Sequence, residues 1–175
     1  MSVESLFLES SAAKLRQFCD RIEVCLEKLS EDQIWARGHE NENAIGNLTL
    51  HLAGNVRQWI VSSLGNNPDR RDRDKEFEAR GGFTAAQLRE KLRETVESAV
   101  AVIQGLTTEQ LTRVYEIQKY RVSGVEVVLH VVEHFAQHTG QIIFAAKMLT
   151  GTDLGFYAHL RKNFETRKTS EAQRP

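Results

Sequence analysis

The sequence predicts an all-α protein built as a four-helix bundle, on three observations. Apolar residues recur at helical spacing in four long segments, several of which begin at a capping motif. Only 2 of the 175 residues are proline, and leucine, glutamate, alanine, arginine and valine are abundant, which favours helices. Four amphipathic helices of this length have to bury their apolar stripes together, and a bundle does so.

The first expected helix covers residues 3–29 and carries an apolar face opposite a charged one. After it, Ser30 and Gln33 form a capping-box pattern for a short turn that contains Ile34 and Trp35. Residues 37–45 are polar and irregular. The apolar face of the first helix consists of Leu6, Phe7, Leu15, Phe18, Ile22, Cys25, Leu26 and Leu29.

The second expected helix runs from about Gly46 to Leu64. His51 lies on its inner side, and Asn55 and Trp59 follow His51 by one and two turns. The three side chains can therefore line one pocket. Taken alone, His51 is also compatible with an ordinary core or surface histidine.

A long connection, residues 65–83, separates the second and third helices. Its charges alternate in sign, which favours a solvated crossover over a phosphate-binding patch, and its length permits a crossover topology in a bundle. Thr84 and Gln87 form a capping box for the third helix, which is expected to end at about Gln104. Residues 113–122 alternate weakly and are expected to be extended.

The fourth expected helix, residues 123–149, contains the most informative pattern in the chain. Ser123 and Glu126 form a capping box at its start. His134 and His138 lie one turn apart on the stripe that is expected to face the core, and His130 lies one turn earlier. That stripe consists of Val127, Val131, His134, His138, Ile142, Ala145 and Leu149.

Histidines four residues apart on a helix can converge on one metal ion. The alternative is a set of packed core histidines, but each buried ring would then need hydrogen-bond partners for its nitrogens. In a bundle, His51 from another helix can meet His134 and His138. Three neutral imidazoles suit Zn, Ni, Fe or Cu. Three protein ligands also leave one position for water or substrate, as in catalytic zinc sites.

Several polar residues can orient these rings through the second ring nitrogen. Asn55, Glu133, Gln137 and Gln141 are all within reach by sequence spacing, and spacing alone does not choose among them. Gln141 either lines the pocket or faces solvent. His130 is a further pocket residue, a fourth ligand or a packing residue, and we expect that it is not a ligand.

The segments Asn47–Trp59 (NLTLHLAGNVRQW) and His134–Ile142 (HFAQHTGQI) together resemble the DinB/YfiT superfamily of metalloenzyme candidates. The likeness is strongest to a bacterial branch with an IGNL segment before the first histidine, and it covers nearly the whole chain. It implies an up-down-down-up bundle and often a homodimer. It also implies a divalent transition metal, Zn, Ni or Fe, held by His51, His134 and His138.

The resemblance says less about the reaction. Better understood relatives are S-transferases and an isomerase that use bacillithiol, mycothiol or glutathione, and others are described as hydrolases. Three functions are therefore open: a metal-dependent transferase that activates a low-molecular-weight thiol for attack on small electrophiles, a hydrolase that uses a metal-bound water, and a non-enzymatic, metal-binding dimeric stress protein.

The composition limits the partners. A net charge of −1, from 23 basic and 24 acidic residues, gives no indication of nucleic-acid binding. No apolar run is long enough to span a bilayer, and the first residues do not form a secretory signal. Cys19 and Cys25 are expected to be ordinary buried thiols. We therefore expect a cytoplasmic protein with a small-molecule substrate, folded as one domain over residues 1–175 with its core at about 3–165.

Overall fold

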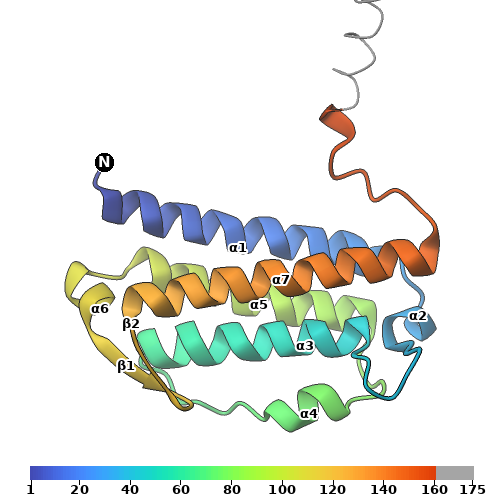
Figure 1. Ribbon diagram of the computed structural model, residues 1–175, viewed down its shortest axis with the longest axis horizontal. Coiled ribbons are helices and arrows are strands. Elements are labelled where there is room, and N and C mark those ends of the chain that lie inside the picture. The colour runs from blue at the N-terminus through green and yellow to red at the C-terminus, as the bar shows by residue number, and fades with distance from the viewer. Residues whose placement is uncertain (161–175) are drawn as a thin grey trace, which may run out of the picture.

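The computed structural model describes residues 1–160, which form a bundle of four long helices (Figure 1). α1 and α3 each pack against both α5 and α7. Figure 1 shows that α1 and α7 run in one direction and that α3 and α5 run in the other. The predicted all-α, up-down-down-up four-helix bundle is thus confirmed. The long helices are α1 (Val3–Glu27), α3 (Ile45–Val56, continued by η1, Arg57–Leu64), α5 (Ala85–Gln104) and α7 (Gly124–Thr150).

Capping residues fix where the long helices begin. Thr84 caps α5, and Ser123 caps α7, as the sequence predicts. At the start of α7 the Ser123 amide donates to Glu126 Oε2 over 2.7 Å, and the Glu126 amide donates back to Ser123 Oγ over 3.3 Å. This reciprocal pair satisfies amides that have no partner within the helix. Gly151 ends α7 with φ 65°, a left-handed conformation that suits glycine.

The second long helix differs from the prediction in its last two turns. Residues 57–64 are wound as a π-helix, in which the amide of Gly65 donates to the carbonyl of Ile60 over 2.9 Å. Such wide turns often occur at functional sites. Apolar spacing did not reveal the change, because one extra residue in two turns hardly alters the pattern.

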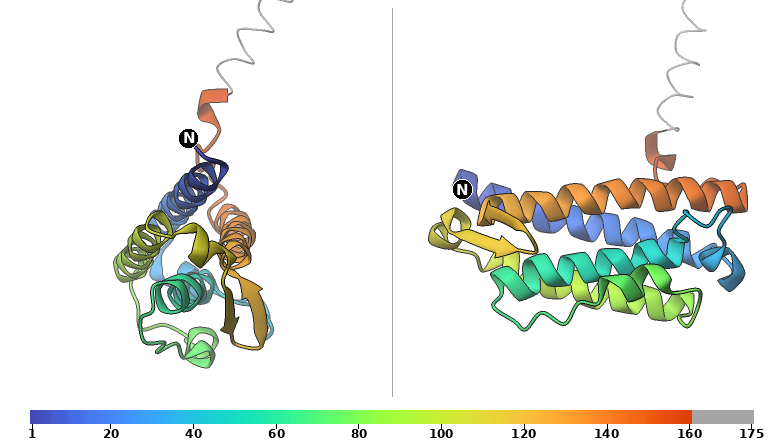
Figure 2. Two further views of the ribbon diagram at one scale, coloured as in Figure 1. Left: turned by 90° about the vertical axis from the view of Figure 1, so that its left-hand side faces the viewer. Right: turned by 60° about the horizontal axis from the view of Figure 1, so that its bottom comes forward.

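The connection between α3 and α5, residues 65–83, is largely exposed, as expected of a solvated crossover, but one part of it is ordered against the bundle. It contains the short helix α4 (Arg73–Glu78), which runs alongside α3 (Figure 1). The end-on view in Figure 2 shows α4 outside the four-helix core. Although the segment is highly charged, Glu76 is buried with only 8% of its surface exposed. A buried carboxylate requires partners, and these position the histidine site described below.

One buried asparagine, Asn47, holds this connection against α3. Its Nδ2 donates to the carbonyls of Glu76 over 2.8 Å and of Ala79 over 2.9 Å. Its Oδ1 accepts from the Ala44 amide over 3.2 Å and from the Arg37 guanidinium over 2.6 Å. Nδ2 also donates to the carbonyl of Phe77 over 3.3 Å. One carboxamide therefore bonds five groups and fixes the path of the connection.

The remaining elements cover the ends of the bundle. Residues 113–122, expected to be extended, form an antiparallel hairpin in which Val114 pairs with Ser123 and Ile117 with Tyr120. Gln118 occupies the turn with φ 57°. The other elements are α2 (Glu31–Trp35), α6 (Thr108–Thr112), β1 (Val114–Ile117) and β2 (Tyr120–Ser123).

The buried face of α7 is rotated slightly from the predicted stripe. Phe135 is fully buried where His134 was expected, and Leu149 is 39% exposed. His134 and His138 are half-buried at the edge of the core. The buried positions of α7 are Gly124, Val127, Val128, Val131, Phe135, Thr139, Ile142 and Ala146.

Among residues 1–160, no helix is both long enough and apolar enough to cross a bilayer. The expected end of the core at about residue 165 lies outside the described residues.

We predict that Asn47→Ala lowers the free energy of unfolding by about 1–3 kcal/mol, because the carbonyls of the connection lose their buried donor. Urea denaturation followed by circular dichroism measures the change. Asn43→Ala is the control, because Asn43 is exposed and makes no side-chain hydrogen bond within the described chain, so its change should stay within about 0.5 kcal/mol. Equal stability of the two variants would contradict the role given to Asn47.

Candidate metal centre

Three histidines from two distant parts of the chain meet between α3 and α7. His51 Nε2 lies 3.1 Å from His134 Nε2, and His138 Nε2 lies 3.2 Å from the same atom. One ligand atom from each ring falls within 4.8 Å of the others. α3 and α7 pack side by side and run in opposite directions, and this packing brings His51 of α3 next to His134 and His138 of α7.

These separations fit a shared cation. Metal–nitrogen bonds of about 2.0–2.1 Å place neighbouring nitrogens of a tetrahedral site roughly 3.3 Å apart. The two distances from His134 Nε2 are close to that edge length, and the ligand atoms of His51 and His138 lie within 4.8 Å of each other. Two neutral imidazoles can form one N–H···N hydrogen bond at this distance. The Nε2 of His134 faces two rings, and a single ring nitrogen cannot form such a bond with both. The donor set therefore suits a divalent transition metal.

A buried ion pair sets the orientation of His51. Its Nδ1 lies 3.0 Å from Glu76 Oε2 and 3.1 Å from Arg71 Nη2. Arg71 binds the same carboxylate through Nε and Nη2, both over 2.8 Å. Burial alone would raise the pKa of Glu76, but hydrogen bonds from Arg71 and His51 outweigh it and hold that pKa below its usual value. An ionised Glu76 keeps the His51 proton on Nδ1, which leaves the Nε2 lone pair free to bind a metal.

The close approach of this ion pair depends on a glycine in α3. A Cβ atom added at Gly54 would lie 1.8 Å from Glu76 Oε1 and 3.0 Å from Arg71 Nε. Only a residue without a side chain leaves room for the carboxylate beside the helix. Gly54 follows His51 by three residues, so the ligand and this space lie on adjacent turns.

A different partner orients His138. Gln141 Oε1 accepts from His138 Nδ1 over 2.6 Å, which again directs Nε2 towards the other rings. Gln141 is thus the one of the four residues proposed from spacing that contacts a histidine of the site. His134 Nδ1 is buried and has no hydrogen-bond partner among residues 1–160.

The environment favours the neutral forms of His134 and His138. Burial, helped by the nearby His138 and His51, lowers the pKa of His134 to about 3. Burial also lowers the pKa of His138, against the opposing hydrogen bond with Gln141. Neutral imidazoles are the form that ligates metals.

His130 lies beside the three rings and outside their cluster. It stacks on Trp59 with ring centroids 4.0 Å apart, and its centroid is 5.6 Å from that of His134. The structure thus places His130 as a packing neighbour of the site. Asn55 Oδ1 and Trp59 Nε1 are buried without hydrogen-bond partners in the described part of the chain, so they flank the site and do not orient its rings.

The other two residues proposed to orient the rings do not do so. Glu133 and Gln137 are exposed and make no side-chain hydrogen bond within residues 1–160. Arg71 and Glu76 were not anticipated, because they lie in a segment whose alternating charges indicated solvent exposure. The only signal was Phe77, an aromatic residue among charges, whose ring lies 4.7 Å from that of His51.

Two hollows adjoin the site along α7. One, of about 320 Å³, is lined by Trp59, His130 and Tyr120. The other, of about 670 Å³, is lined by Gln141, Leu48 and Phe144 among others and is more apolar. The three histidines line neither hollow; their nearest links to them are His130 in the first and Gln141, the partner of His138, in the second.

Comparisons with known proteins agree with this fold. Residues 2–161 match the family described as "Protein of unknown function (DUF1572)". A DinB-like protein, YjoA, from Bacillus subtilis is similar in structure, with 21% identity and a TM-score of 0.64 over 85% of this chain and 97% of the other. A conserved protein from Enterococcus faecalis has 16% identity and a TM-score of 0.68, with coverages of 87% and 99%. A DinB-like protein from Bacillus cereus has 15% identity and a TM-score of 0.65, with coverages of 85% and 93%. A comparison with curated proteins gave no match.

We predict that Gly54→Ala weakens metal binding roughly 10–100-fold, because the added methyl group displaces Glu76 and Arg71 from His51. Competition with a chelating dye measures the affinity. The matched control is Gly140→Ala in α7, where an added Cβ meets nothing within 4 Å. Gly140→Ala should leave metal affinity unchanged and stabilise the helix by about 0.5–1 kcal/mol. Unchanged affinity in Gly54→Ala would contradict the orienting role of the ion pair.

We also predict that the metal-free protein loses stability as the pH falls below about 6.5. The unfolded chain gains a proton at His134 near the ordinary histidine pKa of 6.5, whereas the folded chain does not until about pH 3. The contribution of His134 to the free energy of unfolding is therefore fully present above pH 6.5 and is lost as the pH falls towards 3. Urea denaturation at several pH values measures the slope. His134→Gln should flatten it, and an equal slope in that variant would refute the assignment.

Proposed function

The chain belongs to the DUF1572 family of DinB-like proteins, and from this premise we propose that it binds a divalent transition metal through His51, His134 and His138. The observation that supports the proposal is the pair of Nε2 separations, 3.1 and 3.2 Å, around His134. Imidazole ligands favour Zn, Ni or Fe over Mg or Ca. Three protein ligands leave a further coordination position for a substrate atom.

The proposed activity is a transferase reaction in which a low-molecular-weight thiol attacks a small electrophile. When bound, the cation supplies Lewis acidity that lowers the pKa of a thiol in contact with it. The residues of the chain hold the His134 and His138 imidazoles neutral, bring the three Nε2 atoms together and bury the Glu76–Arg71 pair behind His51. The hollow lined by Gln141, the hydrogen-bond partner of His138, offers space for a reactant near the cluster.

The cysteines of the protein itself favour an external thiol. Cys19 and Cys25 are fully buried. Burial raises the pKa of Cys19 to about 12 and that of Cys25 to about 11, so neither forms a thiolate at neutral pH. Neither is a ligand atom of the histidine cluster. In the proposed reaction the sulfur nucleophile therefore comes from a cosubstrate.

A metal-dependent hydrolase is the second candidate and has weaker support. Hydrolysis by an activated water usually employs a general base close to the metal. Within residues 1–160, Glu76 is the only carboxylate that hydrogen-bonds a histidine of the site, and it is already committed to His51 and Arg71. Glu133 is exposed and contacts none of the three rings. A third candidate, a non-enzymatic metal-binding stress protein, would show metal but no turnover.

We further propose that the protein is a homodimer, as the resemblance to the DinB/YfiT superfamily implies. Phe144 and Met148 lie one turn apart on α7 and are 68% and 71% exposed. Apolar side chains this exposed are suitable for burial against a second copy. Light scattering on the wild type and on Phe144→Glu tests this, since a dimer formed through this face should become monomeric.

We predict that untagged protein contains about one equivalent of metal and that His134→Ala loses it, because His134 Nε2 lies between the other two ligands. Elemental analysis after dialysis measures the content. His130→Ala is the matched control, since it removes a neighbouring imidazole that lies outside the cluster, and it should retain the metal. Full metal content in His134→Ala would refute the site.

The reaction is tested separately with the metal-loaded protein. Bacillithiol, mycothiol and glutathione are each assayed with monochlorobimane, and a panel of esters and amides is assayed without thiol. Turnover that requires both a thiol and the metal supports the transferase. Turnover of esters or amides without thiol supports the hydrolase, and no turnover in a metal-loaded protein supports the non-enzymatic alternative.

A further inference from the structure

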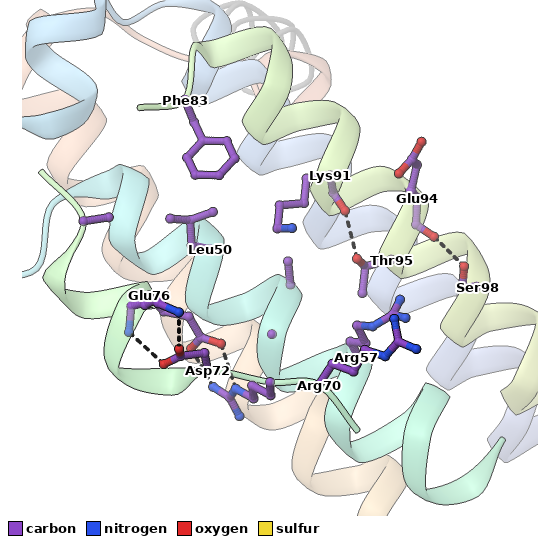
Figure 3. Close-up of a pocket in the computed structure, with 15 residues that line it drawn as sticks. Leu50, Arg57, Arg70, Asp72, Glu76, Phe83, Lys91, Glu94, Thr95 and Ser98 are labelled. Atoms are coloured by element: carbon purple, nitrogen blue, oxygen red, sulfur yellow. Dashed lines mark hydrogen bonds and ion pairs between the residues drawn. The ribbon is translucent and has the colours of Figure 1, made fainter. Parts of the chain in front are cut away.

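A separate hollow lies between α3, the connection and α5, and it is shown in Figure 3. It has a volume of about 530 Å³, which is within the range of small-molecule sites. The three histidines do not line it. The Arg71–Glu76 pair forms part of its wall and separates it from His51.

Three cationic side chains from three different segments line this hollow without a partner of their own. Arg57 belongs to η1, Arg70 to the connection and Lys91 to α5. None of the three side chains makes an ion pair or a hydrogen bond within residues 1–160. This contrasts with other charges of the connection, such as Lys75, which pairs with Asp72 over 2.7 Å. Charges that only keep a surface solvated have no reason to converge from three segments.

The balance of charge in the hollow is positive. Five cations line it against three carboxylates, a net charge of +2 in a protein whose overall charge is −1. Two of the carboxylates, Asp72 and Glu76, are neutralised by Lys75 and Arg71. Glu94 is the one acidic group of the lining without an ion pair in the described chain. Because the lining carries cations without a partner charge, this concave surface should attract and concentrate anions.

The same hollow has an apolar wall. Leu50 and Ala53 of α3 are buried at its side, and the ring of Phe83, which is 37% exposed, lies at one end (Figure 3). Arg57 and Arg70 lie towards the other end and Lys91 lies between the two ends, so the guanidinium groups are gathered away from Phe83. A ligand that fits this arrangement has an oxyanion at one end and a hydrocarbon body at the other.

We propose that this hollow is a binding site for a small organic oxyanion, a phosphate monoester or a carboxylate that carries a short apolar or aromatic group. Guanidinium groups match the geometry of phosphate and carboxylate oxygens, and Lys91 adds a third positive charge. The apolar body lies against Leu50, Ala53 and Phe83. The site is independent of the histidine cluster, so it does not require that the proposed metal site be correct.

The test is isothermal titration calorimetry of the metal-free, full-length protein at low salt. The probes are phenyl phosphate and benzoate, with inorganic phosphate and benzyl alcohol for comparison. We expect saturable one-to-one binding of at least one aromatic anion, weaker binding of inorganic phosphate and none of benzyl alcohol. Use of the metal-free protein separates a failure of this site from a failure of the metal site.

Paired variants locate the binding. The double variant Arg70→Ala with Lys91→Ala should bind the aromatic anion at least tenfold more weakly than the wild type. Glu94→Gln should bind the aromatic anion severalfold more tightly, because the substitution removes a carboxylate that repels the anion. The control combines Lys28→Ala with Lys119→Ala, two exposed lysines away from the hollow, and it should bind as the wild type does.

Three results would overturn the proposal. The first is no saturable binding of either aromatic anion. The second is equal weakening in the two double variants, which would indicate a general effect of net charge. The third is equal affinity for inorganic phosphate and phenyl phosphate, because the apolar wall would then contribute nothing.

Discussion

The antiparallel contact between α3 and α7 controls both the core and the histidine site. It buries the apolar faces of both helices and brings His51 opposite His134 and His138. It also places His134 and His138 at the edge of the core, because Phe135 takes the central position beside His134, whereas His51 is buried. A half-buried position lowers the pKa of an imidazole without isolating it from a ligand. The helix packing therefore determines the chemistry of the rings as well as their location.

Much of this arrangement follows from local patterns in the sequence. The caps at Ser123 and Thr84, the four helices and the meeting of the three histidines all depend on helical spacing and short-range motifs. The exact face of α7 did not follow, because a stripe with period 3.6 tolerates a rotation of some tens of degrees. The π-helical turns of η1 and the helix α4 were also missed, since both are stabilised by contacts with distant residues.

The least predictable part of the site is the buried Arg71–Glu76 pair. In sequence, these residues belong to a run of alternating charges, which normally remains in water. Burial of both is tolerated because each charge is neutralised by the other and Glu76 also accepts from His51. No periodicity encodes such a pairing, because it depends on the path of the connection over α3. Besides Phe77, the absence of a side chain at Gly54 is a local trace of it.

The carboxamide of Asn47 has a consequence for exchanging loops between members of the family. The carbonyls it holds belong to Glu76 and Ala79, on the same short stretch that supplies the carboxylate to His51. A transplanted stretch from Arg71 to Ala79 would therefore be a functional unit only if Asn47 and Gly54 accompanied it from the donor.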